Sequence, residues 1–135
     1  MSSPSDLRYS KEHEWVRVED GVGTIGITEY AQDQLGDIVY LDLPEEGATI
    51  KQFEKLGEIE SVKAVSDLFV PVSGEVAEIN QEAVDSPELV NQDPYGRGWL
   101  LKVHLSDERE VEGLLSAQEY DELVAAEQAE EAGGP

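Results

Sequence analysis

The stretch Gly57-Glu-Ile-Glu-Ser-Val-Lys63-Ala-Val-Ser-Asp-Leu-Phe-Val-Pro-Val-Ser-Gly74-Glu-Val places two short runs of β-forming residues on either side of a lysine. We expect strands at Gly57–Ser61 and Leu68–Val72, joined by a turn over Val62–Ser66. Lysine is scarce, with only five in the chain. A hairpin tip would project the amine of Lys63 into solvent, where a modifying enzyme can acylate it. An exposed lysine at a turn more often serves only to keep the surface soluble. This pattern alone therefore leaves two interpretations open, a modified lysine and an ordinary surface lysine.

The rest of the chain predicts further short strands and few helices. Asp20-Gly21 between apolar runs is typical of a hairpin turn. Thr28 can cap a helix over Glu29–Leu35, which Gly36 would end. Further strands are expected at His13–Val18, through Ile25 and Ile27, at Ile38–Leu43, at Thr49–Phe53, at Glu75–Ile79 and at Gly98–Leu105.

Helix signals gather in the last third of the chain. Asp85 or Ser86 could cap a brief helical turn that has Pro87 at its first position. Residues 91–96 are expected to form a loop after it. Ser106 or Asp107 would open a first C-terminal helix, and Ser116-Ala-Gln-Glu119 has the form of a capping box for a second. We expect one domain over residues 1–125, followed by an acidic, flexible tail over 126–135.

Composition excludes several classes of function. The 135 residues include 31 acidic and 9 basic side chains and no cysteine, so the formal net charge is −22. Disulfides and thiolate sites are therefore excluded, and nucleic acid and anionic lipid would be repelled. No apolar stretch approaches the ~20 residues of a membrane span, and no targeting segment is visible. We expect a cytoplasmic protein of bacterial type, or a mature mitochondrial matrix protein if the chain is eukaryotic.

The usual catalytic and metal motifs do not point to an enzyme. Gly21-Val-Gly-Thr-Ile-Gly26 satisfies the dinucleotide-binding pattern, but its β-forming residues do not open the long helix that such a site needs. His13 and His104 have no second histidine at ligand spacing, and no catalytic pair can be chosen among 31 carboxylates. We predict no catalytic residue and no metal site.

A series of motifs along the chain resembles the H-protein family of the glycine cleavage system, in the order of that family. The resemblance spans roughly Leu7 to Val124. It is carried by His13-Glu14-Trp15, Gly26-Ile-Thr-Glu-Tyr-Ala-Gln, Leu35-Gly-Asp-Ile-Val-Tyr-Leu-Asp-Leu-Pro44, Glu60-Ser-Val-Lys63-Ala, Pro71-Val-Ser-Gly-Glu-Val, Pro87-Glu-Leu-Val-Asn-Gln-Asp-Pro-Tyr95 and Gly98-Trp99-Leu100.

The resemblance implies a mainly β fold, a flattened lipoyl-domain-type β-barrel or sandwich with short peripheral and C-terminal helices. It implies that Lys63 carries lipoate through an amide. Biotin carriers share this fold but flank their lysine with methionines, and lipoyl domains of 2-oxoacid dehydrogenases usually place Asp directly before it. Lys63 instead lies between Val62 and Ala64.

By the same resemblance the protein is a monomeric carrier rather than an enzyme. Its partners would be the pyridoxal-phosphate glycine dehydrogenase (decarboxylating), aminomethyltransferase, dihydrolipoamide dehydrogenase and a lipoyl-attaching enzyme. The carrier would take an aminomethyl group from glycine decarboxylation to aminomethyltransferase, and then electrons to dihydrolipoamide dehydrogenase.

The resemblance also suggests side chains that would serve the arm. Glu14 and Asp67 are candidates for a cleft in which a carboxylate pairs with the ammonium of the carried group. Glu60 and Gly74 are candidates for recognition by the lipoyl-attaching enzyme. Each has a plain structural alternative, since the first two could be ordinary exposed carboxylates and the last two could simply shape the turn.

Three other functions remain open at this point. A relay carrier that passes lipoyl groups to 2-oxoacid dehydrogenases would share the fold and Lys63. A nonlipoylated acidic interaction module would show no modification in cells. An independent enzyme would require turnover by the unmodified chain.

Overall fold

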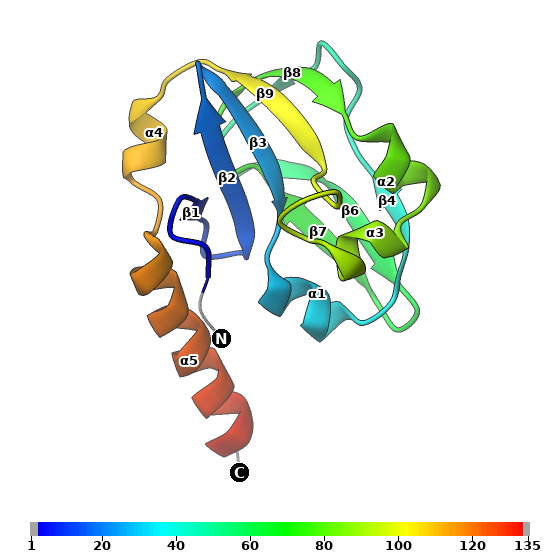
Figure 1. Ribbon diagram of the computed structural model, residues 1–135, viewed down its shortest axis with the longest axis vertical. Helices are drawn as coiled ribbons and strands as arrows, with labels where there is room; N and C mark the ends of the chain where they lie inside the picture. The colour runs from blue at the N-terminus through cyan, green and yellow to red at the C-terminus, as the bar shows by residue number, and fades with distance from the viewer. Residues whose placement is uncertain (1–2, 134–135) are drawn as a thin grey trace.

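The protein is a sandwich of two antiparallel β-sheets, described by a computed structural model over residues 3–133 (Figure 1). The larger sheet contains, in spatial order, β1 (Arg8–Tyr9), β2 (Glu14–Glu19), β3 (Val22–Ile27), β9 (Leu101–Leu105), β8 (Gly74–Ile79) and β5 (Thr49–Ile50). The smaller sheet contains β4 (Ile38–Asp42), β6 (Lys55–Ser61) and β7 (Val65–Phe69). The expectation of a mainly β sandwich is confirmed, and the two sheets do not close into a single barrel.

The helices lie at the edges of the sandwich. They are α1 (Glu29–Leu35), α2 (Gln81–Asp85), α3 (Glu88–Gln92), α4 (Arg109–Glu112) and α5 (Ala117–Gly133). The first four are short, whereas α5 has 17 residues and extends beyond the two sheets.

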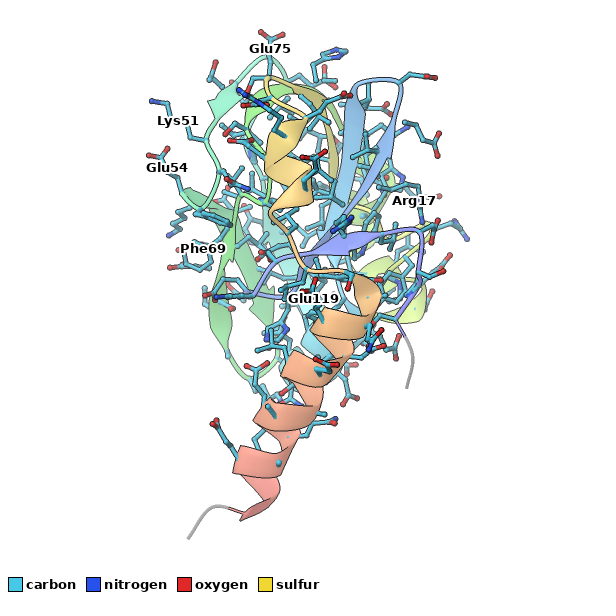
Figure 2. All side chains as sticks on the ribbon, turned by 90° about the vertical axis from the view of Figure 1, so that its left-hand side faces the viewer. Arg17, Lys51, Glu54, Phe69, Glu75 and Glu119 are labelled. Carbon is cyan, nitrogen blue, oxygen red and sulfur yellow. The ribbon has the colours of Figure 1, made fainter. Side chains whose placement is uncertain are left out.

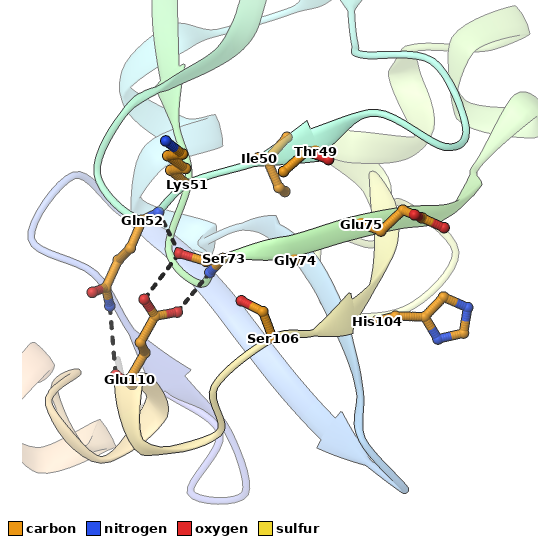
Figure 3. A pocket seen from close by; sticks show the side chains of 10 residues that line it. All are labelled: Thr49, Ile50, Lys51, Gln52, Ser73, Gly74, Glu75, His104, Ser106 and Glu110. Carbon is orange, nitrogen blue, oxygen red and sulfur yellow. Dashed lines mark hydrogen bonds between the residues drawn. The ribbon is translucent and has the colours of Figure 1, made fainter.

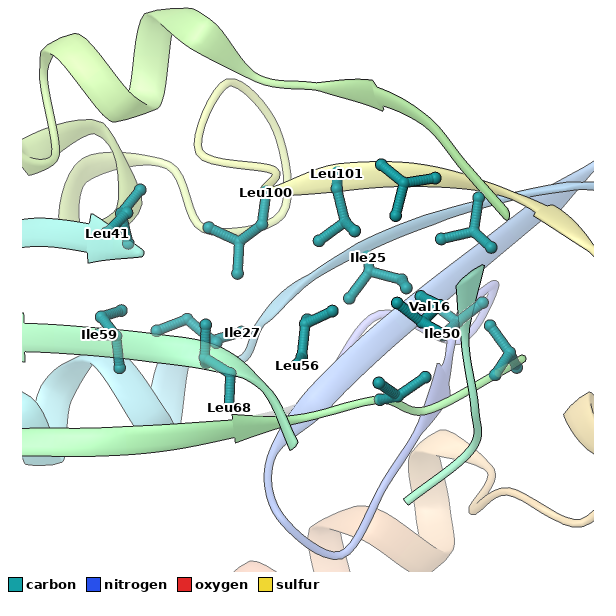
Figure 4. Packing of buried hydrophobic residues seen from close by; sticks show 14 of the residues in the cluster. Val16, Ile25, Ile27, Leu41, Ile50, Leu56, Ile59, Leu68, Leu100 and Leu101 are labelled. Atoms are coloured by element: carbon teal, nitrogen blue, oxygen red, sulfur yellow. The ribbon is translucent and has the colours of Figure 1, made fainter. Parts of the chain in front are cut away.

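One apolar core fills the space between the sheets (Figure 4). Val16 and Ile25 project into it from the larger sheet, and Ile59 and Leu68 project from the smaller one. Each of these side chains is at most 2% exposed. Because successive residues of a strand point to opposite faces, burial of Ile59 and Leu68 leaves Glu60 and Asp67 facing solvent. In the larger sheet, the opposite face is covered where Trp15 packs in a second cluster.

A second apolar cluster attaches the chain ends to the sandwich. Tyr9 of β1 stacks on Tyr120 of α5 with ring centroids 4.6 Å apart. Trp15 is fully buried beside them and donates a hydrogen bond from Nε1 to the carbonyl oxygen of Pro94 at 3.0 Å. This cluster fixes the start of α5 against the beginning of β2.

Three local signals in the sequence correspond to the structures they predicted. The Asp20-Gly21 turn joins β2 to β3 with both residues at positive φ. Thr28 caps α1, since its Oγ1 accepts a hydrogen bond from the amide of Ala31 at 3.2 Å. Ser116 and Glu119 form the reciprocal capping box at the start of α5.

The strands around Lys63 are displaced from their predicted positions. β6 begins at Lys55, two residues early, and β7 covers Val65–Phe69 rather than Leu68–Val72. The turn is therefore only three residues long. Short apolar runs do not fix a strand register, and here the register follows the tight turn and the burial of Ile59 and Leu68.

Other boundaries differ for local reasons. β5 stops at Ile50 instead of Phe53, which adopts a φ of 68° and donates its amide to the carbonyl of Val70. α2 was not predicted, and α3 includes Asn91 and Gln92, which we expected in a loop. The C-terminal strand begins at Leu101 rather than Gly98.

Helix α5 includes most of the segment 126–135 that we expected to be a flexible tail. The helix continues through Gly133, with Glu127 3.1 Å from Nε2 of His13 and Glu131 accepting a hydrogen bond from Tyr30 at 3.1 Å. Residues 126–133 are thus helical, and residues 134–135 lie outside the described part. Flexibility of this segment stays a prediction. Within residues 3–133, no helix is long and apolar enough to cross a bilayer.

The close contact between Gly26 and Trp15 predicts a sensitive position. A Cβ at Gly26 would lie 2.5 Å from two atoms of the indole, which its hydrogen bond to Pro94 holds in place. Gly26→Ala should lower the free energy of unfolding by about 2–3 kcal/mol in urea denaturation, as overpacked core sites do. Gly113→Ala is the matched control, because its Cβ would meet nothing closer than 3.6 Å. Equal stability of the two variants would contradict the rigid Trp15 contact.

Candidate functional site

Lys63 lies at the centre of a turn that is closed by hydrogen bonds from within. The amide of Ser61 donates to the carbonyl of Ala64 at 2.8 Å, and Oγ of Ser61 accepts from the amides of Lys63 and Ala64 at 3.3 and 3.2 Å. The amide of Val62 donates to the carbonyl of Asp37 at 2.9 Å, which ties the turn to the start of β4. The backbone is thus fixed while the Lys63 side chain is exposed.

The stem of Lys63 lies against the end of α1. A Cβ at Gly36 would be 3.5 Å from Cε and 3.9 Å from Nζ of Lys63, and Gly36 itself has a φ of 79°. Glycine is required there for the backbone conformation. A Cβ there would make only ordinary van der Waals contact with the lysine stem, so the backbone conformation is what explains the glycine.

Glu14 carries the only buried carboxyl group among the described residues. It is 1% exposed and lies where the two sheets meet. The hydroxyl of Ser10 donates to Oε1 at 2.5 Å, and the amide of Phe69 donates to Oε2 at 3.2 Å. One side chain therefore joins β2 of the larger sheet to the end of β7 in the smaller sheet.

A cavity of about 430 Å³ opens beside Glu14. Apolar side chains, among them Phe53, Phe69 and Leu114, make up most of its lining, and Lys11 and Glu12 line it as well. In Figure 2, Phe69 and Glu54 lie on the same edge of the molecule. The site could hold a cationic group, because such a group would find a carboxylate in a mostly apolar wall.

Burial sets the protonation of this carboxyl group. Removal from water raises the pKa of Glu14 to about 7, against the opposing effect of the hydrogen bonds from Ser10 and Phe69. Near neutral pH the group exchanges between its neutral and ionised forms. A cation entering the cavity would favour the ionised form.

Comparison with known proteins places this arrangement in a family. The family model described as "Glycine cleavage H-protein" matches residues 7–127. The glycine cleavage system H proteins of Symbiobacterium thermophilum and Marinobacter nauticus are each 58% identical to this chain. The matches cover 87% of this chain and 92% of the first relative, and 93% and 97% for the second. The chain belongs to the glycine cleavage H-protein family.

A solved structure supports the same assignment for the fold. The crystal structure of a glycine cleavage system H protein from Mycobacterium marinum superposes with a TM-score of 0.85 at 42% sequence identity. The match covers 91% of this chain and 99% of that one. The family resemblance seen in the sequence motifs is confirmed, and it extends over nearly the whole chain.

Within this family member, Asp67 lies apart from the Glu14 cavity. It is exposed on β7, and its Oδ1 pairs with Nζ of Lys55 at 3.2 Å. It is not among the residues that line the cavity. The structure does not bring the two predicted carboxylates together, and a role for Asp67 toward the arm stays a prediction.

Glu60 and Gly74 also lie in different places. Glu60 is exposed on β6 and pairs in register with Val65, one residue beyond the turn. Gly74 begins β8, beyond the other end of β7, and lines a separate hollow with Ser73 and Glu110 (Figure 3). A Cβ at Gly74 would collide with the carbonyl oxygen of His104, so close strand packing explains this glycine. Recognition by an attaching enzyme stays a prediction for both residues.

Sequence reasoning missed the partners of Glu14. Ser10 is four residues away in the chain and gives no local signal. The Phe69 amide is 55 residues away, and Phe53, which also lines the cavity, adopts a positive φ that its residue type does not suggest. The contact from Phe69 arises from the packing of one sheet on the other, whereas the contact from Ser10 forms within the segment that joins β1 to β2.

The raised pKa of Glu14 predicts a pH dependence of stability. Between pH 4.5 and about 7 the folded chain holds a proton that the unfolded chain has lost, so the free energy of unfolding falls as pH rises, by at most ~1.4 kcal/mol per pH unit. Glu14→Gln should remove this contribution. In urea denaturation from pH 4.5 to 7.5, the free energy of unfolding of wild type should fall by about 3 kcal/mol relative to that of the variant. A constant difference between the two proteins would contradict the raised pKa.

Proposed function

We propose that this chain is the lipoyl-bearing carrier of a glycine cleavage system and that Lys63 is its attachment residue. The observation that carries the proposal is an exposed lysine on a closed turn of β6 and β7, within a member of the glycine cleavage H-protein family. The hydrogen-bonded turn presents a constant backbone shape to an attaching enzyme. The exposed stem leaves the amine available for acylation.

The proposed role is that of a carrier rather than an enzyme. Bound lipoate would supply a disulfide that is reduced when one of its sulfurs takes the aminomethyl group left by glycine decarboxylation. Aminomethyltransferase would pass the methylene to tetrahydrofolate and release ammonia, and dihydrolipoamide dehydrogenase would oxidise the remaining dithiol back to the disulfide. The protein's own contribution is to hold the attachment point, to present it to each partner and to shelter the carried group. Tethering keeps that group at a high effective concentration for whichever enzyme is docked.

Glu14 and its cavity are the proposed shelter. The turn that bears Lys63 and the Phe69 amide that contacts Glu14 lie at opposite ends of β7, a strand of five residues that spans about 16 Å. An ammonium in the cavity would pair with the Glu14 carboxylate, and Phe53 and Phe69 would limit the access of water.

Lys63→Arg tests the attachment residue. Arginine keeps the positive charge but cannot form the lipoyl amide, so the variant should fold normally and lose carrier activity completely. Intact mass after incubation with the lipoyl-attaching enzyme should show the lipoyl increment on wild type and on the control Lys102→Arg, but not on Lys63→Arg. A lipoyl increment on Lys63→Arg would refute the assignment.

Glu14→Gln tests the shelter. The amide keeps the shape of the side chain but not its charge, so the isolated aminomethyl-carrying protein should release its group about tenfold faster, the factor expected for a lost charge-assisted contact of ~1.4 kcal/mol. Lipoylation should be unaffected. Release is followed as formaldehyde and ammonia at pH 7.5, with Glu19→Gln on the exposed end of β2 as control. The same rate in all three proteins would assign Glu14 a structural role only.

The relay alternative is separated by the choice of acceptor. The lipoylated chain should support glycine decarboxylation by the glycine dehydrogenase. If it supported only transfer of lipoyl groups to 2-oxoacid dehydrogenase domains, the relay function would replace this proposal.

A further inference from the structure

Large exposed apolar side chains concentrate around the Lys63 turn. Of the six that the described chain exposes, four are there, namely Val39, Tyr40, Val62 and Val65, with exposed fractions between 48% and 68%. Contiguous exposed apolar groups are uncommon on monomers and usually mark a contact surface. Phe53 of the remaining two belongs to the Glu14 cavity.

The strand register brings Tyr40 and Val65 onto one side of the smaller sheet. Tyr40 of β4 pairs with Glu60 of β6, and Glu60 pairs with Val65 of β7, so the three form a row across the sheet with strands about 4.8 Å apart. Val39 occupies the bulge between Ile38 and Tyr40. Val62 follows directly after β6, at the turn.

A second row of the same sheet is acidic. Asp42, Glu58 and Asp67 pair in register across β4, β6 and β7. Lys55 is the cation of this row, with Nζ 2.8 Å from Glu58 and 3.2 Å from Asp67. Three carboxylates against one ammonium leave the row negative. Like charges on facing strands destabilise a sheet, so this row is not explained by stability.

We propose that these two rows, together with Val39 and Val62, form the docking face for the glycine dehydrogenase that loads the Lys63 arm. We call this set of residues the hairpin face. It would contact an apolar patch on the enzyme around Tyr40 and Val65, and Lys or Arg side chains flanking that patch would face the carboxylate row. The inference rests on the proposed function, because it takes its location from the arm at Lys63.

Charge favours an enzyme over a second copy of this chain as the occupant. A twofold pairing of hairpin faces would bring two acidic rows, on chains of charge −22, toward each other. A basic partner surface would instead be attracted to the row. On the hairpin face, Tyr40 and Val65 flank the exposed Glu60, and such a mixture of apolar and charged side chains is usual in interfaces between proteins that separate after contact.

The test measures the carrier as a substrate. Lipoylated wild type, Tyr40→Ala, Val65→Ser and Asp42→Asn are prepared, with Val18→Ser as the control for an exposed valine on β2. Intact mass confirms full lipoylation, and thermal unfolding confirms that each variant folds. Rates of glycine decarboxylation by the glycine dehydrogenase are then measured against carrier concentration.

The hairpin face predicts a change in KM without a change in kcat. Tyr40→Ala should raise KM at least tenfold and Val65→Ser several-fold, because aromatic residues at the centre of an interface carry most of its energy. Asp42→Asn should reduce the rise of KM with added sodium chloride. Val18→Ser should stay within twofold of wild type.

Three results would contradict the proposal that the hairpin face is a docking surface for the enzyme. One is KM values for Tyr40→Ala and Val65→Ser within twofold of wild type. Another is a fall in kcat at constant KM, which would place these residues in chemistry rather than docking. A third is a wild-type dimer in sedimentation that Tyr40→Ala abolishes, which would make a second copy the occupant. An inactive lipoylated wild type would instead refute the proposed function itself, and the docking face with it.

Discussion

The apolar layer between the two sheets is the constraint that places every other feature of this protein. Ile59 and Leu68 must point into that layer to cover Val16 and Ile25 of the larger sheet. Because strands alternate, the intervening residues of β6 and β7 then face solvent, and the turn between the strands emerges at one end of the sandwich. The exposure of Lys63 thus follows from the burial of Ile59 and Leu68 in the two strands that the turn joins.

The same constraint explains a carboxyl group at the junction of the sheets. Glu14 begins β2 directly before Trp15, and burying this part of the strand buries the carboxyl group as well. The group is tolerated because Ser10 and the Phe69 amide both donate to it. A buried acid held in this way is partly neutral near pH 7, which makes the adjacent cavity responsive to a cation.

Strand β7 contributes to attachment, shelter and docking at different positions along its length. β7 carries the attachment turn at one end, the amide that contacts Glu14 at the other, and outward-facing Val65 and Asp67 between them. α5 has a different part: Tyr120 stacks on Tyr9 and hydrogen-bonds His13 and Thr28, which fixes the segment preceding Glu14 and the cap of α1 together. Helix α5 thereby holds in place the segment before Glu14, which borders the cavity, and the start of α1, whose other end contacts Lys63.

The local features and the family can be inferred from the amino-acid sequence alone. The Asp20-Gly21 hairpin, the capped helix after Thr28 and the capping box at Ser116 depend on neighbours within four residues, so they could be predicted from the chain alone. The lysine turn was located in the same way, although its strand limits were not. The Glu14 cavity and the hairpin face depend on the folded arrangement, because strand pairing and sheet packing bring together the amide of Phe69 and the rows across β4, β6 and β7. Those contacts join residues far apart in the chain, and no local pattern encodes them.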